Sequence, residues 1–109
     1  MIKNIIFSIV ISSVILAKGY SAQAVSTGKL TEYPKFESKF ISARDVCVWV
    51  PDGYSAKEKY DVIYMHDGQM LFDANTTWNK QEWKIDEIAG KLIKEGKIRK
   101  SIVVAVSNI

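Results

Sequence analysis

Residues 60–66 read YDVIYMH, and Asp67-Gly68 follows them directly. Four consecutive residues of this stretch, 62–65, are apolar or aromatic, and no polar residue alternates with them. A strand of this kind is usually covered on both faces, as strands are in a parallel sheet. The stretch therefore predicts a buried strand that ends in a sharp turn.

A helix and another strand are predicted next along the chain. Between Glu82 and Lys94 the apolar residues recur at helical spacing and fall on one face: Ile85, Ile88, Ala89, Leu92 and Ile93. Gly96 is well placed to end this helix in a left-handed conformation. Residues 102–106 read IVVAV, another run with no polar interruption. Strand, helix and strand in this order predict a parallel β-α-β crossover.

The residues before this unit predict further strands. In Arg44–Val50 the side chains alternate between two faces, and Pro51-Asp52-Gly53 ends the run with turn chemistry. Lys35–Phe40 is short and mixed, which favours an edge strand. Val25–Thr31 is polar, and we expect a loose lead-in. Gln69–Lys80 is expected to form a long polar-aromatic loop.

The predicted fold class is α/β, with about four strands and one crossover helix. One helix covers one face of a sheet, yet two strands have the composition of strands buried on both faces. We therefore expect the N-terminal part of an incomplete α/β sheet that belongs to a larger domain. A complete small domain is the alternative.

The first 24 residues have the three parts of a secretory signal peptide. Lys3 gives a positive start, residues 5–17 are uncharged and apolar, and Ala22-Gln23-Ala24 supplies a small-x-small cleavage site. We expect cleavage after residue 24, export to the periplasm or the medium, and a mature domain of residues 25–109. No stable membrane span is then expected, because the apolar run is short for a bilayer. An uncleaved anchor or a buried core helix is the alternative.

Charge and cysteine content exclude several classes of protein. The formal net charge of the 109 residues is +3. Removal of the leader would take away Lys3 and Lys18 but no acid, which leaves a net charge of +1. Such a nearly neutral chain gives no electrostatic reason to expect a nucleic-acid partner. A single cysteine, Cys47, excludes an internal disulfide and a multi-thiolate metal site. We expect Cys47 to be a small strand residue rather than a reactive thiol.

With these elements in place, residues 44–109 resemble the "Putative esterase" (esterase D-like) family of α/β-hydrolases. The stretches that carry the resemblance, in order, are RDVCVWVPDGY, YDVIYMHDGQMLFD, WNKQEW and SIVVAVSNI. The resemblance covers only the first part of a typical family domain. It implies a serine carboxylic-ester hydrolase that acts on a small-molecule or carbohydrate ester. We expect no cofactor and no metal.

Serine ester hydrolysis needs an activated hydroxyl and preorganised donors for the oxyanion. In α/β-hydrolases one donor N–H comes from the loop after the third strand, and the resemblance places that loop at His66–Gln69. Gly68 would let the backbone turn tightly, the Gln69 N–H is the candidate donor, and Met70 is the neighbouring alternative.

The nucleophile is missing from this sequence. No G-x-S-x-G elbow occurs in it, and in this fold the serine, the acid and the histidine follow later in the chain. We therefore assign no nucleophile, acid or base of the triad to this chain, and expect the nucleophile beyond Ile109. The chain by itself should be inactive.

Several residues invite a functional interpretation. His66 is expected to close a buried strand and to bond nearby backbone rather than to act as a base. Asp67, Asp73 and Asp86 have no calcium-loop spacing, which favours turn and cap roles over metal binding.

The aromatic loop Phe72–Trp83 leaves a second function open. Trp78 and Trp83 could line a substrate cleft, and Trp83 could equally be the first core contact of the helix. The alternatives to an esterase are an exported carbohydrate-binding or interaction module and a non-functional truncated remnant. An unpaired apolar edge at residues 60–66 would also favour self-association.

Overall fold

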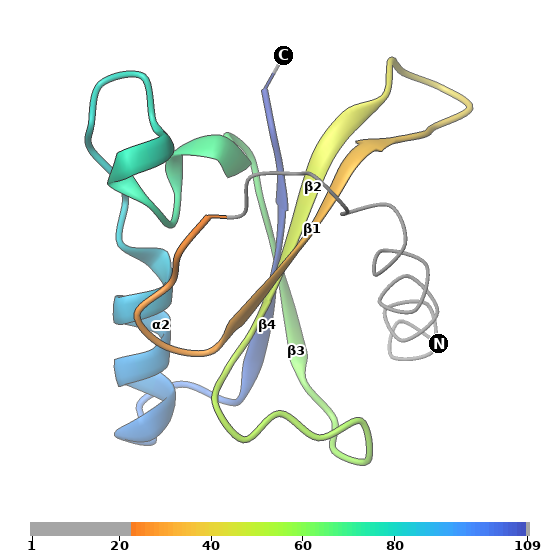
Figure 1. Cartoon of the computed structure of the whole chain (residues 1–109). Helices are drawn as coiled ribbons and strands as arrows, with labels where there is room; N and C mark the ends of the chain where they lie inside the picture. Colours follow the sequence, from red (N-terminus) through yellow and green to blue (C-terminus); the bar gives the residue numbers. More distant parts are fainter. Residues whose placement is uncertain (1–22, 109) are drawn as a thin grey trace.

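The computed structural model describes residues 23–108 and places a parallel crossover at the centre of the fold (Figure 1). Strand β3 (Asp61–Met65) pairs in parallel with β4 (Ser101–Val106), with Val62 opposite Ile102. The helix α2 (Ile85–Lys94) connects them and lies on one face of the sheet. The predicted β-α-β unit is confirmed. The predicted leader falls outside the described residues, apart from its last two.

Two antiparallel strands complete the described sheet. They are β1 (Lys29–Phe36) and β2 (Arg44–Val50), and the order across the sheet is β1-β2-β4-β3. The predicted fold class, α/β with four strands and one helix, is therefore confirmed. The edge strand predicted at Lys35–Phe40 is found as β1 at the edge of the described sheet, but its bounds are wrong, because β1 begins six residues earlier, at Lys29, and ends at Phe36.

Pairing with β2 explains why the polar lead-in forms a strand. Lys29 lies opposite Val50 and Thr31 opposite Val48, so the β2 ladder satisfies the backbone polar groups of a segment with little apolar content. The neighbouring side chains of Glu32 and Tyr33 are buried.

The lead-in itself is held by hydrogen bonds rather than loose. The Ser26 N–H donates to Asp86 Oδ2 at 2.7 Å, and Trp49 Nε1–H donates to the Thr27 carbonyl at 2.8 Å. Gly28, at φ +74°, passes so close to the carbonyl oxygen of Val50 that no Cβ would fit. The lead-in thus ties β2 to α2.

The two faces of the sheet carry two hydrophobic clusters. The cluster beneath α2 combines sheet residues with residues of the following loop and the helix, chiefly Trp49, Val103, Leu71, Phe72 and Ala89. The cluster on the other face is smaller and contains the buried residues Tyr33, Val48 and Ile102.

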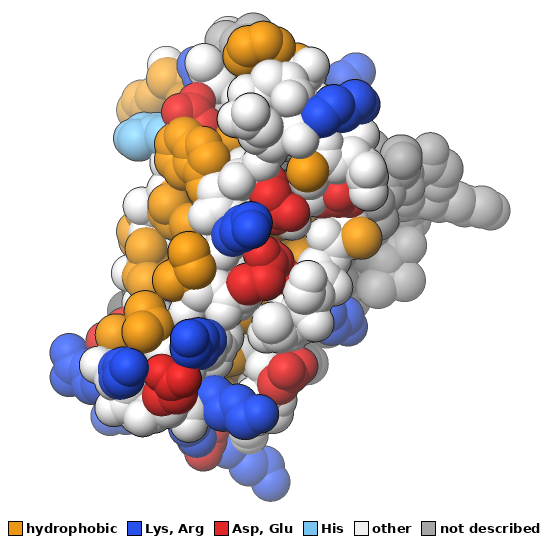
Figure 2. All heavy atoms as spheres, turned by 90° about the vertical axis from the view of Figure 1, so that its left-hand side faces the viewer, with side chains coloured by type: hydrophobic (Ala, Val, Ile, Leu, Met, Phe, Trp, Pro, Cys, Tyr) orange, Lys and Arg blue, Asp and Glu red, His pale blue; other side chains and the backbone are white. Residues whose placement is uncertain are grey.

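The prediction that Tyr60–His66 is buried on both faces is wrong for this strand. β3 is mostly exposed, and Tyr64 keeps 67% of its accessible surface. β3 lies at the edge of the described sheet and β4 lies inside it, so only β4 is covered as expected. Figure 2 shows hydrophobic side chains gathered along one side of the molecule.

The helix begins three residues later than predicted and ends where the sequence indicates. Lys84 adopts φ 56°, a left-handed conformation that separates Trp83 from the helix, and the first helical residue is Ile85. Gly96 follows the last turn at φ 71°, as predicted. Within residues 23–108, no helix is long and apolar enough to cross a membrane.

Candidate functional site

The carboxyl ends of β3 and β4 lie side by side at the same end of the sheet, because the two strands are parallel. The loops that follow such strand ends are where open α/β sheets bind ligands. A cavity of about 410 Å³ opens at these strand ends. It is lined by Ile41, Arg44, His66, Asp67, Val106, Ser107 and Asn108. This is the candidate active site.

The turn after β3 is pressed against β4. Asp67 takes the left-handed conformation at φ 55°, which is strained for a residue with a side chain. A Cβ built on Gly68 would lie 3.0 Å from the carbonyl carbon and oxygen of Ala105. The sequence reasoning assigned the tight turn to Gly68, but the positive φ is at Asp67. Gly68 is required for the close approach.

The turn continues into the 3-10 helix η1 (Gly68–Met70), which distinguishes the two candidate donors. The Met70 N–H donates to the Asp67 carbonyl at 2.8 Å, so it is already engaged. The Gln69 N–H belongs to the first turn, where a helical N–H has no partner within the helix. The Gln69 side chain accepts a hydrogen bond from the Asn108 N–H at 2.9 Å, which fixes this loop to the residues after β4.

His66 does not close a buried strand, so this expectation is wrong. Its side chain is exposed at the rim of the cavity. Among the hydrogen bonds of residues 23–108, none involves its imidazole ring, so the expected bond to backbone is absent there as well. The physical reason is the edge position of β3, whose end has no covering element in the described chain.

Arg44 is a site residue that the sequence did not reveal. The antiparallel register pairs Val46 with Val106 and carries Arg44 to the level of residue 108, beside the cavity. Its Nε is buried and has no hydrogen-bond partner among the described residues. A guanidinium here could donate to a carboxylate or an ester oxygen. Only the strand pairing brings Arg44 to the site, and no local sequence signal indicates that pairing.

The two tryptophans of the aromatic loop lie outside both described cavities. Trp78 exposes 84% of its surface and Trp83 exposes 50%. The Trp83 N–H donates to the Met70 carbonyl at 3.0 Å, which ties the aromatic loop to η1. Trp83 is not the first core contact of the helix, because that role belongs to Ile85, which packs against the larger cluster.

The three aspartates differ in their roles. Asp73 caps the second 3-10 helix, η2 (Ala74–Thr76), by accepting from the Asn75 N–H at 2.9 Å, as predicted. Asp67 occupies the cap position of η1, but its side chain makes no capping bond. Asp86 is not a cap, since it lies inside the first turn of α2 and is fully buried.

Asp86 lies beside two glutamates, and like charge accumulates there. One ligand-type oxygen from each of Glu82, Asp86 and Glu87 lies within 4.8 Å of the others. Burial raises the pKa of Glu82 above its usual value, and the Asp86 charge adds to the effect. Burial, followed by the hydrogen bond and the charge of Asp86, raises the pKa of Glu87 to about 7.

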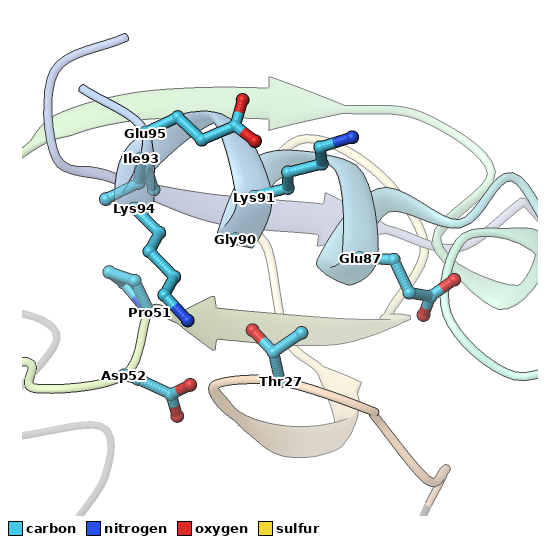
Figure 3. Close-up of a pocket in the computed structure, with 9 residues that line it drawn as sticks. All are labelled: Thr27, Pro51, Asp52, Glu87, Gly90, Lys91, Ile93, Lys94 and Glu95. Carbon is cyan, nitrogen blue, oxygen red and sulfur yellow. The ribbon is translucent and has the colours of Figure 1, made fainter. Parts of the chain in front are cut away.

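The largest described cavity lies elsewhere, between α2 and the lead-in. It measures about 940 Å³, and Figure 3 shows α2 on one side with Thr27 and the turn residues Pro51 and Asp52 opposite. Its charged side chains are of both signs, and its lining has no serine, cysteine or histidine. Acyl-transfer chemistry is therefore better served by the smaller cavity at the strand ends.

Comparison with solved structures identifies the fold. A serine-to-alanine mutant of the feruloyl esterase module from Clostridium thermocellum, complexed with sinapinate, matches 77% of this chain at 24% identity, with a TM-score of 0.53. The ferulic acid esterase from the anaerobic fungus Anaeromyces mucronatus, without substrate, matches 80% at 24% identity and a TM-score of 0.55. The same fungal enzyme has been solved with ferulic acid, at 22% identity and a TM-score of 0.53.

The match covers only part of these esterases. This chain spans 28% of the bacterial chain and 31% of the fungal one. At these identities the likeness is one of fold. The family match is of sequence, since residues 38–109 match the family described as "Putative esterase", which is most of the described sheet and all of the candidate site. The chain belongs to this esterase family.

Proposed function

We propose that this chain supplies one donor of the oxyanion hole in a carboxylic-ester hydrolase whose nucleophilic serine lies beyond Ile109. We call the turn that carries this donor, His66–Gln69, the oxyanion corner. The observation that carries the proposal is the arrangement of the turn after β3. The Met70 N–H is engaged within the turn, the Gln69 N–H is left for a ligand, and the Asn108 N–H fixes the Gln69 side chain.

The chemistry assigned to this corner is electrostatic. A serine oxygen attacks the ester carbonyl, and the proton of the serine passes to a histidine. The carbonyl oxygen becomes negative and accepts a hydrogen bond from the Gln69 N–H, together with the N–H after the serine. Collapse of the tetrahedral intermediate releases the alcohol, which takes the proton from the histidine, and water then hydrolyses the acyl-enzyme.

For substrate, we propose esters of aromatic carboxylic acids, including those linked to carbohydrate. The support comes from the related structures, which hold sinapinate and ferulic acid. Arg44 lines the same cavity and has an unpartnered buried Nε that could donate to a carboxylate or ester oxygen of such a substrate. Methyl ferulate is therefore the first substrate to assay.

The test begins with the coding DNA after Ile109. We expect an open frame that encodes a G-x-S-x-G elbow, and a product of that frame that hydrolyses methyl ferulate. Gly68→Val in that product should lower kcat by about 100-fold or more, because one oxyanion donor typically contributes 10²–10³-fold.

The control introduces the same residue, as Lys59→Val, on the exposed segment before β3, at the opposite end of that strand from the candidate site. It should leave kcat unchanged. A stop codon directly after Ile109 would refute the assignment of the nucleophile. Equal turnover by Gly68→Val and the control would refute the oxyanion role.

We further propose that the protein is exported and processed after Ala24. The support is the charge, apolar run and small-x-small pattern of the first 24 residues. Amino-terminal sequencing of the protein from the periplasm or the medium should begin at Val25. Recovery of exported material that begins at Met1 would contradict this proposal.

A carbohydrate-binding role is the second candidate, and one observation favours it. Trp78 exposes 84% of its surface on a loop, which suits stacking on a sugar ring. Binding to xylan that is lost in Trp78→Ala and retained in Phe40→Ala would favour this role. Phe40 is a suitable control because it is 92% exposed. A truncated remnant without function is the third possibility, and it predicts neither turnover nor binding.

A further inference from the structure

We propose that the carboxylates of Glu82, Asp86 and Glu87 form a binding site for a hard divalent cation, Ca²⁺, at the start of α2. One oxygen from each residue lies within 4.8 Å of the other two, so a single ion could contact all three. The site is separate from the oxyanion corner.

The buried oxygen atoms of this cluster point to a missing partner. Asp86 is completely buried; its Oδ2 accepts from the Ser26 N–H at 2.7 Å, and its carboxyl group also hydrogen-bonds with Glu87. Asp86 Oδ1 and Glu82 Oε2 are buried and have no hydrogen-bond partner within the described chain. Buried carboxylate oxygens are costly when unpaired, whereas a cation would satisfy both.

Within the described chain, Lys84 places a positive charge near Glu82 but forms no ion pair with the cluster. The ion pairs of residues 23–108 lie elsewhere, at Lys97–Glu95, Arg99–Asp61 and Lys100–Glu58. The amino terminus of α2 contributes about half a positive charge. Three carboxylates can carry up to three negative charges, so the helix dipole alone does not balance them.

The donor set selects the kind of ion. All three ligands are carboxylate oxygens, which suit hard cations, whereas zinc and copper favour nitrogen and sulfur. Ca²⁺ accepts irregular geometry and can complete its shell of six to eight ligands with water. Glu82 and Glu87 are partly exposed, and Glu87 also lines the 940 Å³ cavity, which gives a hydrated ion a route to the site (Figure 3).

The experiment uses Tb³⁺ as a luminescent substitute for Ca²⁺ on the full chain. Trp83 neighbours Glu82 in the sequence, so its excitation should sensitise bound Tb³⁺. We expect saturable luminescence that Ca²⁺ displaces. Asp86→Asn and Glu82→Gln should each weaken Tb³⁺ binding at least tenfold, and Glu95→Gln, at the other end of the same helix, should not change it.

A second measurement covers the case in which Asp86→Asn fails to fold. Ca²⁺ at roughly millimolar concentration, the range of extracellular calcium modules, should raise the unfolding temperature of the wild-type chain, and Glu87→Gln should abolish the increase. Absence of saturable Tb³⁺ luminescence would overturn the proposal. So would equal losses in Glu82→Gln and Glu95→Gln, or an unfolding temperature that Ca²⁺ leaves unchanged.

Discussion

At the scale of single residues, the candidate site depends on how closely one loop approaches one strand. Asp67 supplies the left-handed turn, and Gly68 allows contact with the backbone of Ala105. The dipeptide Asp-Gly indicated a turn, but its sequence could not show which residue takes the positive φ. It also could not show the packing against Ala105, because that contact spans more than thirty residues.

Replacing Gly68 with alanine should destabilise the chain. The added Cβ would lie 3.0 Å from the carbonyl group of Ala105, so the loop or β4 must shift. Overpacking of this kind costs about 1–3 kcal/mol. Urea unfolding of the Gly68→Ala variant should show a lower midpoint at an unchanged slope. A midpoint equal to that of the wild type would show that the loop is free to move.

Cys47 should be chemically inert in the folded chain. It keeps 2% of its accessible surface, and burial raises the pKa of its thiol to about 12. The reactive thiolate is therefore scarce at pH 8. Iodoacetamide should label Cys47 slowly in buffer and rapidly in concentrated urea. Equal labelling rates under the two conditions would contradict the buried position.

At the scale of elements, Gln23 and Ala24 tie the segment before β1 to the sheet and to the aromatic loop. The Gln23 N–H donates to Glu32 Oε2 at 3.0 Å, and the Ala24 N–H donates to Asp73 Oδ2 at 2.8 Å. Cleavage after Ala24 would remove both donors. The mature chain that begins at Val25 should thus unfold at a lower urea concentration than a chain that begins at Gln23, and equal midpoints would contradict this.

Glu32 should make the stability of the sheet depend on pH. Burial raises its pKa in the folded chain above 4.5, despite the hydrogen bonds from Gln23 that lower it. The unfolded chain therefore loses this proton first, and stability falls as the pH rises from 4.5 through the folded pKa. The free energy of unfolding of Glu32→Gln, compared with that of the wild type, should therefore be larger at pH 7 than at pH 4. A difference that is the same at both pH values would contradict the assignment.

Element types were predictable where the apolar pattern is strong. The spacing of Ile85, Ala89 and Ile93 indicated α2, and runs of apolar or aromatic residues with no polar interruption indicated β3 and β4. Element ends were less predictable, because long-range bonds decide them. The Ile85 N–H donates to the Leu71 carbonyl, which fixes the helix start, and β1 is a strand because β2 provides its partners.

At the scale of the whole molecule, the sheet has an uncovered edge. β3 pairs with β4 on one side, and on its other side the described chain provides no strand. Ile63 and Tyr64 are exposed on β3, and Trp83 and Ile88 are exposed in the loop and helix. The sequence predicted an apolar surface without its second cover and an unpaired edge at residues 60–66, and the described sheet does end at β3.

An open edge of this kind should cause the chain to self-associate. Unpaired strand edges with apolar side chains are sites of edge-to-edge pairing, and lysine on the edge prevents it. Sedimentation velocity should show an average mass that rises with concentration, and Tyr64→Lys should reduce it. A monomer at every concentration would show that the edge is protected.

The central claim is that the chain supplies an oxyanion corner without a nucleophile, and a fluorophosphonate probe tests it most directly. The purified chain is incubated with the probe, with a feruloyl esterase as the positive control, and both are analysed by mass spectrometry. We predict that the esterase gains the mass of the adduct and that this chain remains unmodified. A covalent adduct on any serine of this chain would contradict the account.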